Sequence, residues 1–124
     1  MAATVTISNR VELAGLGKDL VMQDVAVDAT TPTAFTYNYR KLAVADTAEA
    51  LDLGDVATVT GIWIRAIDYA LYVDTSYVAA FSAEMTLAAG GPPAFIPTPS
   101  GTVYVKNVTA AQTPVYEAVV WGTT

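Results

Sequence analysis

The stretch ALDLGDVATVTGIWIRAIDYALYVDT, from Ala50 to Thr75, carries the densest strand signal in the chain. Successive side chains of a β-strand point to opposite faces of the sheet. In this stretch Trp63 and Ile67 project on one side, while Ile62 and Ile64 project on the other. Large apolar side chains on both faces predict an inner strand that is covered on both sides.

Similar alternation recurs along the rest of the chain, punctuated by turn signals rich in Pro and Gly, such as GGPP (90–93) and PTPSG (97–101). About eight short strands with such spacing predict an all-β, antiparallel sandwich or barrel. The remaining expected strands are Val5–Ser8, Asp19–Asp28, Ala34–Val44, Leu71–Val73, Phe81–Leu87, Val103–Val105, and a closing strand with Val115, Val119 and Trp121.

Two segments also permit a helical interpretation. DTAEALDL (46–53) has the spacing of a capping box, because Asp46 precedes Glu49 by three residues. KDLVMQDVAV (18–27) can be read with a helical period. We favour strand or loop for most of both segments, since an isolated helix would have no second helix to pack against.

The composition is that of one globular domain, residues 1–124, with enough apolar surface that we expect partner subunits to cover part of it. Charged residues make up 15% of the chain and hydrophobic residues 53%, whereas soluble domains average about 25% charged residues. No apolar window approaches the roughly 18–20 residues of a membrane-spanning helix. MAATVTISNR (1–10) lacks the basic region of a secretory signal, so we expect synthesis in a cytoplasm and no membrane partner.

The residue inventory disfavours catalysis and nucleic-acid binding. The chain has no His and no Cys, so Ser-His-Asp and Cys-His sites are impossible. Six basic residues are scattered against twelve acidic ones, and phosphate backbones require clustered Lys and Arg. Most acids stand beside turns, where a solvated or turn-capping role is the simplest interpretation. We therefore expect no enzyme, no metal, no cofactor and no nucleic-acid partner; a small hydrolase would need two acids facing each other in a cleft.

Aromatic residues suggest a contact surface. Phe35, Tyr37 and Tyr39 share one face of their strand. These side chains could pack in the core, form a subunit contact, or, if they are exposed, form a carbohydrate-binding platform. We favour packing in the core or a subunit contact over the carbohydrate-binding platform. Trp63 is expected in the core, and Trp121 in the core or at an interface.

Arg65 is the unusual charge, because it lies inside a strongly apolar strand. It is expected either to pair with a carboxylate, since an unpaired buried charge is very costly, or to keep its head in water at the rim. The candidate interface residues are therefore Arg65, Phe35, Tyr37, Tyr39 and Trp121.

The order of strands and turns from Ala50 to Thr123 resembles a family of small virion structural proteins of tailed bacteriophages. LDLGD, GIWIRAID and YALYVDT are followed by a glycine-marked turn, then TVYVKNVT and VYEAVVWGT. Arg65 and Ala66 stand where such proteins often have a Lys-Asn pair, and the GGPP insert also departs from the pattern. The resemblance rests on strands and turns and contains no catalytic motif.

The resemblance implies a jelly-roll-like β-sandwich that decorates or cements a capsid, often as a homotrimer. Its partners would be the major capsid protein or other virion subunits, and its location would be the virion, assembled in the host cytoplasm. Residues 1–10 would act as an N-terminal arm or edge strand that adds to a partner's sheet. The alternative is a carbohydrate-binding or host-adhesion sandwich from a tail or fibre.

Overall fold

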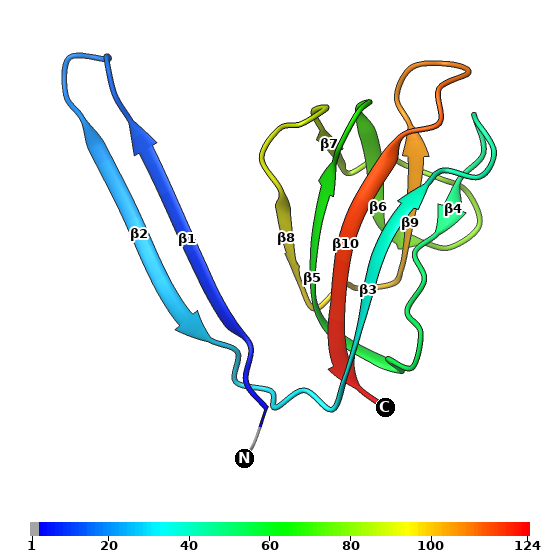
Figure 1. Ribbon diagram of the computed structural model, residues 1–124, viewed down its shortest axis with the longest axis horizontal. Coiled ribbons are helices and arrows are strands. Elements are labelled where there is room, and N and C mark those ends of the chain that lie inside the picture. Colours follow the sequence, from blue (N-terminus) through cyan, green and yellow to red (C-terminus); the bar gives the residue numbers. More distant parts are fainter. Residues whose placement is uncertain (1–2) are drawn as a thin grey trace. The chain divides into compact units, whose positions relative to one another are not determined.

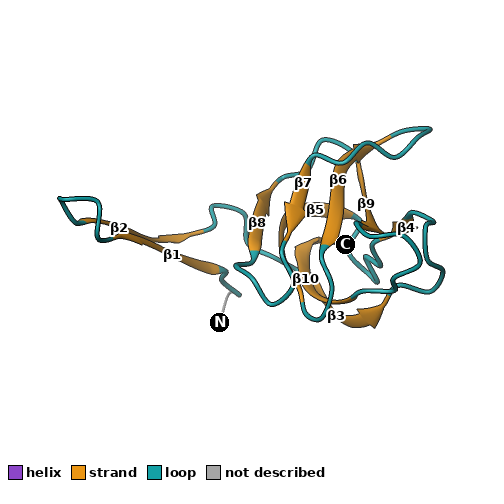
Figure 2. Ribbon diagram, turned by 90° about the horizontal axis from the view of Figure 1, so that it is seen from above, coloured by secondary structure: helices purple, strands orange, loops and turns teal. Residues whose placement is uncertain are grey.

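The computed structural model describes residues 3–124, and these form ten β-strands and no helix (Figures 1 and 2). The prediction of an all-β chain is confirmed. Residues 1 and 2, the start of the expected arm, lie outside the described residues. None of the described chain forms a helix long and apolar enough to cross a membrane. The chain divides after Pro32 into two compact units.

The first unit is a single β-hairpin. Strands β1 (Thr6–Leu13) and β2 (Leu20–Val27) pair antiparallel, from Thr6 opposite Val27 to Leu13 opposite Leu20. Gly15 and Gly17 in the connecting loop have φ values of 84° and 89°, which glycine adopts without a steric penalty. The segment 18–27 is therefore a strand, as preferred over a helix.

The second unit, Thr33–Thr124, is a sandwich of two four-stranded antiparallel sheets. The first sheet has the order β3-β10-β5-β8, and the second has the order β4-β9-β6-β7. The bounds are β3 (Ala34–Lys41), β4 (Glu49–Ala50), β5 (Thr58–Ala66), β6 (Leu71–Tyr77), β7 (Met85–Leu87), β8 (Ala94–Pro97), β9 (Thr102–Asn107) and β10 (Val115–Thr123).

The pairing of the sandwich strands follows a simple rule. The first of the eight strands pairs with the last, β3 with β10, and the second with the seventh, β4 with β9. The third pairs with the sixth, β5 with β8, and the two middle strands, β6 and β7, pair with each other. This is the pattern of one long two-stranded ribbon that has been folded over into two sheets.

The core lies between the two sheets and belongs entirely to the second unit. Its side chains come from alternate positions of the strands, as period-two burial requires. The buried hydrophobic residues of this cluster are Leu42, Leu51, Val56, Ile62, Ile64, Ala66, Leu71, Val73, Leu87, Ile96, Val103, Val105, Tyr116, Ala118 and Val120. No residue of the hairpin belongs to the cluster.

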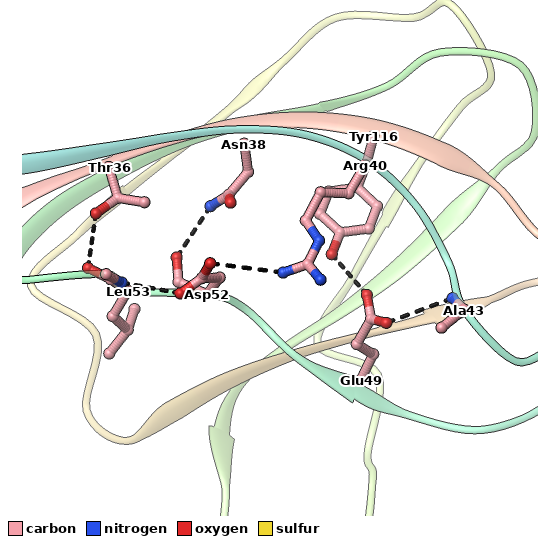
Figure 3. Close-up of polar contacts among 9 residues, drawn as sticks. Thr36, Asn38, Arg40, Ala43, Glu49, Asp52, Leu53 and Tyr116 are labelled. Carbon is pink, nitrogen blue, oxygen red and sulfur yellow. Dashed lines mark hydrogen bonds and ion pairs between the residues drawn. The ribbon is translucent and has the colours of Figure 1, made fainter.

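Polar contacts close the sandwich along β3 (Figure 3). Thr36 Oγ1 donates to the carbonyl of Leu53 at 2.7 Å, and Asn38 Nδ2 donates to the carbonyl of Asp52 at 2.9 Å. Arg40 Nη1 lies 3.6 Å from Asp52 Oδ2. The even-numbered side chains of β3 therefore hold the segment around Asp52 against the inner side of the first sheet.

Three expectations need correction. The sandwich does not span residues 1–124. Among the described residues Thr6–Leu13 pairs only with β2, so the separate N-terminal part extends to Pro32 and not to residue 10. The 46–53 segment forms no helical turn; it contains the two-residue strand β4. Of the expected strand Phe81–Leu87, only Met85–Leu87 pairs with a neighbour.

Candidate functional site

The outer face of the β3-β10-β5-β8 sheet carries a row of aromatic side chains. Tyr37 lies opposite Val119, which lies opposite Trp63, which in turn lies opposite Phe95. Because paired residues in a sheet share a face, this row crosses all four strands.

Three aromatic residues on β3 are exposed on this face. Phe35, Tyr37 and Tyr39 are 73%, 55% and 59% exposed, respectively. The alternative that placed them in the chain's own core is therefore wrong. Apolar rings exposed side by side make this face a candidate contact surface.

Trp63 was expected in the core and instead lies half-buried on this outer face. The inner face of β5 is occupied by Ile62, Ile64 and Ala66, all of them buried. Both faces of β5 are apolar, so the sequence pattern gave no basis for choosing between them. The sandwich makes the choice, because only one face of each sheet looks toward the other sheet.

Trp121 also lies on the outer face, but its ring is covered. It is 6% exposed, and its ring stacks on that of Phe95 with the centroids 5.9 Å apart. Gly61 makes room for the ring, because a Cβ at this position would lie 2.3 Å from a ring carbon of Trp121. Of the candidate interface residues, Trp121 thus supports the face and presents little surface of its own.

A polar row lies beside the aromatic one. Arg65 pairs with Glu117, the Nε–Oε1 distance being 2.7 Å, and its guanidinium carbon lies 5.8 Å from the centroid of the Trp63 ring. The expected pairing of Arg65 with a carboxylate is therefore present, although the side chain is 44% exposed. An ion pair at this degree of exposure adds about 0–1 kcal/mol of stability, so its main effect is to orient the two groups.

Tyr37 joins the polar row to the aromatic one by donating a hydrogen bond from its hydroxyl to Glu117. This hydrogen bond, followed by that from Arg65, lowers the pKa of Glu117. The same bond raises the pKa of Tyr37, because ionising the phenol would remove the donor and place two negative charges together. The carboxylate is thus held ionised between a cation and a phenol on an otherwise apolar face.

Among the acids elsewhere, Asp74 and Glu84 are brought together by Ser76. The Ser76 hydroxyl donates to Glu84 and lies 3.5 Å from Asp74 Oδ1. Asp74 is 2% exposed and accepts hydrogen bonds from the backbone N–H groups of Ser76 and Ser82, both at 2.9 Å. These bonds fasten the loop between β6 and β7, which is a structural use of the carboxylate.

An open depression on the other sheet has a volume of about 350 Å³ and is lined by residues that include Asp46, Phe81 and Lys106. The carboxylate of Asp46 accepts a hydrogen bond from Asn107 Nδ2 at 2.8 Å and others from the Ala111 N–H. Asp46 thus organises two loops. Within residues 3–124, no three His, Cys, Asp or Glu side chains converge as they would around a metal ion.

A second exposed apolar surface is the hairpin, of which the sequence analysis anticipated only residues 1–10, as a possible N-terminal arm or edge strand. Its strand β2 is exposed at every position, and β1 at every position except Ile7. The one available signal is LVMQDVAV (20–27), where apolar residues occupy both faces of a strand. Comparison with protein-family models, with curated proteins and with solved structures finds no match for this chain.

Proposed function

We propose that this chain is a non-enzymatic structural protein of a phage virion, and specifically a capsid decoration or cement protein. It would bind the head shell and stabilise it by bridging neighbouring subunits. The observation that carries the proposal is the hairpin of residues 6–27, whose apolar side chains are exposed on both faces. A two-stranded hairpin by itself is at best marginally stable in water, so covering these apolar side chains would stabilise this unit.

Two further features support the proposal. The pairing of first with eighth, second with seventh and third with sixth strand matches what is expected of a jelly roll, a fold that occurs in viral capsid proteins. The outer sheet face adds a second surface, where rings surround the Arg65–Glu117 pair. A subunit with two apolar surfaces and few charges suits an assembly in which neighbours cover both.

The test is binding to heads. The purified chain is incubated with empty heads of the phage that encodes it and separated on a density gradient. We expect the chain to sediment with the heads and to raise the temperature at which they open. Heads of an unrelated phage are the control. A chain that stays at the top of the gradient at saturating concentration would overturn the proposal.

A carbohydrate-binding or host-adhesion module is the second candidate, favoured by one observation. Phe35, Tyr37 and Tyr39 form an exposed aromatic row, which is the surface that such a module needs. Binding to a glycan array that is lost in the variant Tyr37→Ala/Tyr39→Ala and kept in Val78→Ala would establish this function. An array without signal would remove it.

A further inference from the structure

The exposed apolar side chains of the described residues are concentrated on two surfaces. Fourteen large hydrophobic side chains are exposed; eight lie between Val11 and Val27, and three are Phe35, Tyr37 and Tyr39 of β3. We call the first surface the arm, residues 6–27, and the second the β3 edge, residues 34–41. Each surface carries several exposed apolar side chains close together, and patches of this kind mark association sites.

The arm has the pattern of a strand pair covered on both faces. Val11, Leu13, Leu20 and Met22 share one face, as the pairs Val11–Met22 and Leu13–Leu20 show. The opposite face of β2 carries Val21, Val25 and Val27. Strands that are apolar on both faces belong inside a structure and not at its surface.

The β3 edge is open to a further strand. Within residues 3–124, β3 is an outer strand of its sheet and pairs only with β10. The Leu42 N–H donates to the Pro114 carbonyl, and bonded and non-bonded pairs alternate along an antiparallel ladder. The even-numbered residues of β3 thus face β10, and the odd-numbered ones, Phe35, Tyr37 and Tyr39, direct their N–H and C=O groups to the open edge. Unpaired backbone groups of this kind are a template for strand addition.

The dimensions favour a second copy of this chain as the occupant. Strands β1, β2 and β3 each have eight residues, so arm and edge match in length. An eight-residue hairpin is about 27 Å long and roughly 10 Å wide, so each face covers on the order of 270 Å² in projection. A stable interface covers about 800 Å² per partner. Mutual exchange doubles the covered area relative to one arm on a foreign surface, because each copy then contributes an arm and receives one.

We infer that the arm of one copy adds to the β3 edge of a second copy, with β2 next to β3, and that this exchange builds a closed homo-oligomer. Main-chain hydrogen bonds along β3 would supply affinity, and contact of the arm's aliphatic side chains with Phe35 and Tyr39 would supply specificity. The inference rests on the proposed function, since it describes the unit that would bind the head.

Native mass by light scattering at about 100 µM tests the exchange, using full-length chains. The wild type should have a mass of 26 or 39 kDa, for two or three copies of the 13.0 kDa chain. The arm variant Val11→Asp/Met22→Asp and the edge variant Phe35→Asp/Tyr39→Asp should each fall to 13.0 kDa. The matched control Val78→Asp changes a side chain that is 90% exposed outside both surfaces and should keep the wild-type mass.

Mixing the two variants gives the decisive result, because one retains an arm and the other retains an edge. The mixture should recover a 26 kDa species that neither variant forms alone. A wild type of 13.0 kDa, an arm variant with the wild-type mass, or a mixture that stays monomeric would each overturn the inference.

A disulfide provides an independent measurement, because the chain has no cysteine of its own. Met22→Cys in one copy and Tyr39→Cys in another should form a mixed disulfide under mild oxidation, at least tenfold faster than Met22→Cys with Val78→Cys. Equal rates would contradict the exchange.

The exchange and the proposed function can fail separately. A wild-type monomer that still binds heads would overturn the exchange alone. An oligomer that depends on the arm but does not bind heads would overturn the proposed function alone.

Discussion

At the scale of the residue, two glycines of the first sheet are indispensable for different reasons. A Cβ on Gly61 would meet the side-chain ring of Trp121, whereas a Cβ on Gly122 would lie 1.9 Å from the backbone oxygen of Thr58, which no side-chain rotation can move aside. Gly61→Ala should lower the free energy of unfolding by about 1–3 kcal/mol, and Gly122→Ala by more. Urea denaturation measures both. If the cost of Gly61→Ala is unchanged in a Trp121→Ala background, the ring is not the obstacle.

The second residue-scale prediction concerns pH. Hydrogen bonds from the Ser82 and Ser76 N–H groups lower the pKa of Asp74 in the folded chain. The unfolded chain therefore binds a proton at Asp74 more readily than the folded chain does. The contribution of Asp74 to the stability of the fold is fully present above the ordinary pKa of the carboxyl, near 4. It is lost as the pH falls through the lower pKa of the folded chain. Asp74→Asn should cost about 1–3 kcal/mol at pH 7 and should flatten the decline in stability below about pH 4. Urea titrations at several pH values measure this.

The control is Asp55→Asn, which removes the same charge from an exposed turn. Its stability at pH 7 should lie within about 0.5 kcal/mol of the wild type. An equal loss in the two variants would show that net charge, and not the hydrogen bonds of Asp74, is responsible.

At the scale of the element, β3 separates stability from association along one strand. Asn38 points inward, is buried and donates to the Asp52 carbonyl, whereas its neighbour Tyr39 points outward. Asn38→Ala should lower the free energy of unfolding by about 1–3 kcal/mol, because it removes a buried amide and its part-buried hydrogen bond to the Asp52 carbonyl. Tyr39→Ala should change it by less than about 0.5 kcal/mol and weaken self-association. Chemical denaturation and light scattering on both variants check the contrast, and a destabilised Tyr39→Ala would contradict it.

At the scale of the whole molecule, the core lies entirely in Thr33–Thr124. Deleting residues 1–32 should therefore leave a cooperative thermal transition in the remaining chain. The full chain should melt at a temperature that rises with protein concentration, because association stabilises the folded state by mass action, and the truncated chain should not. Differential scanning calorimetry at 10 and 300 µM measures both. Loss of the cooperative transition on truncation would show that the hairpin belongs to the folding unit.

The sequence alone determined the class of fold and most of the strands. Alternation of apolar and polar residues is a local property, and it located β2, β3, β5, β6, β9 and β10 from a few residues each. Turn residues indicated where strands end, because their effect on the backbone is also local. The sequence also indicated that Arg65 would need a carboxylate. It did not identify that carboxylate as Glu117, which lies 52 residues further along the chain.

Tertiary structure alone decided which face of each strand is inside. Trp63 and Ile62 are both apolar, and only the position of the second sheet makes Ile62 the core residue. It also decided that β3 pairs with β10 across some eighty residues and that the N-terminal hairpin has no share in the core. Pairing partners and buried faces depend on contacts distant in sequence, and a local pattern contains no information about them.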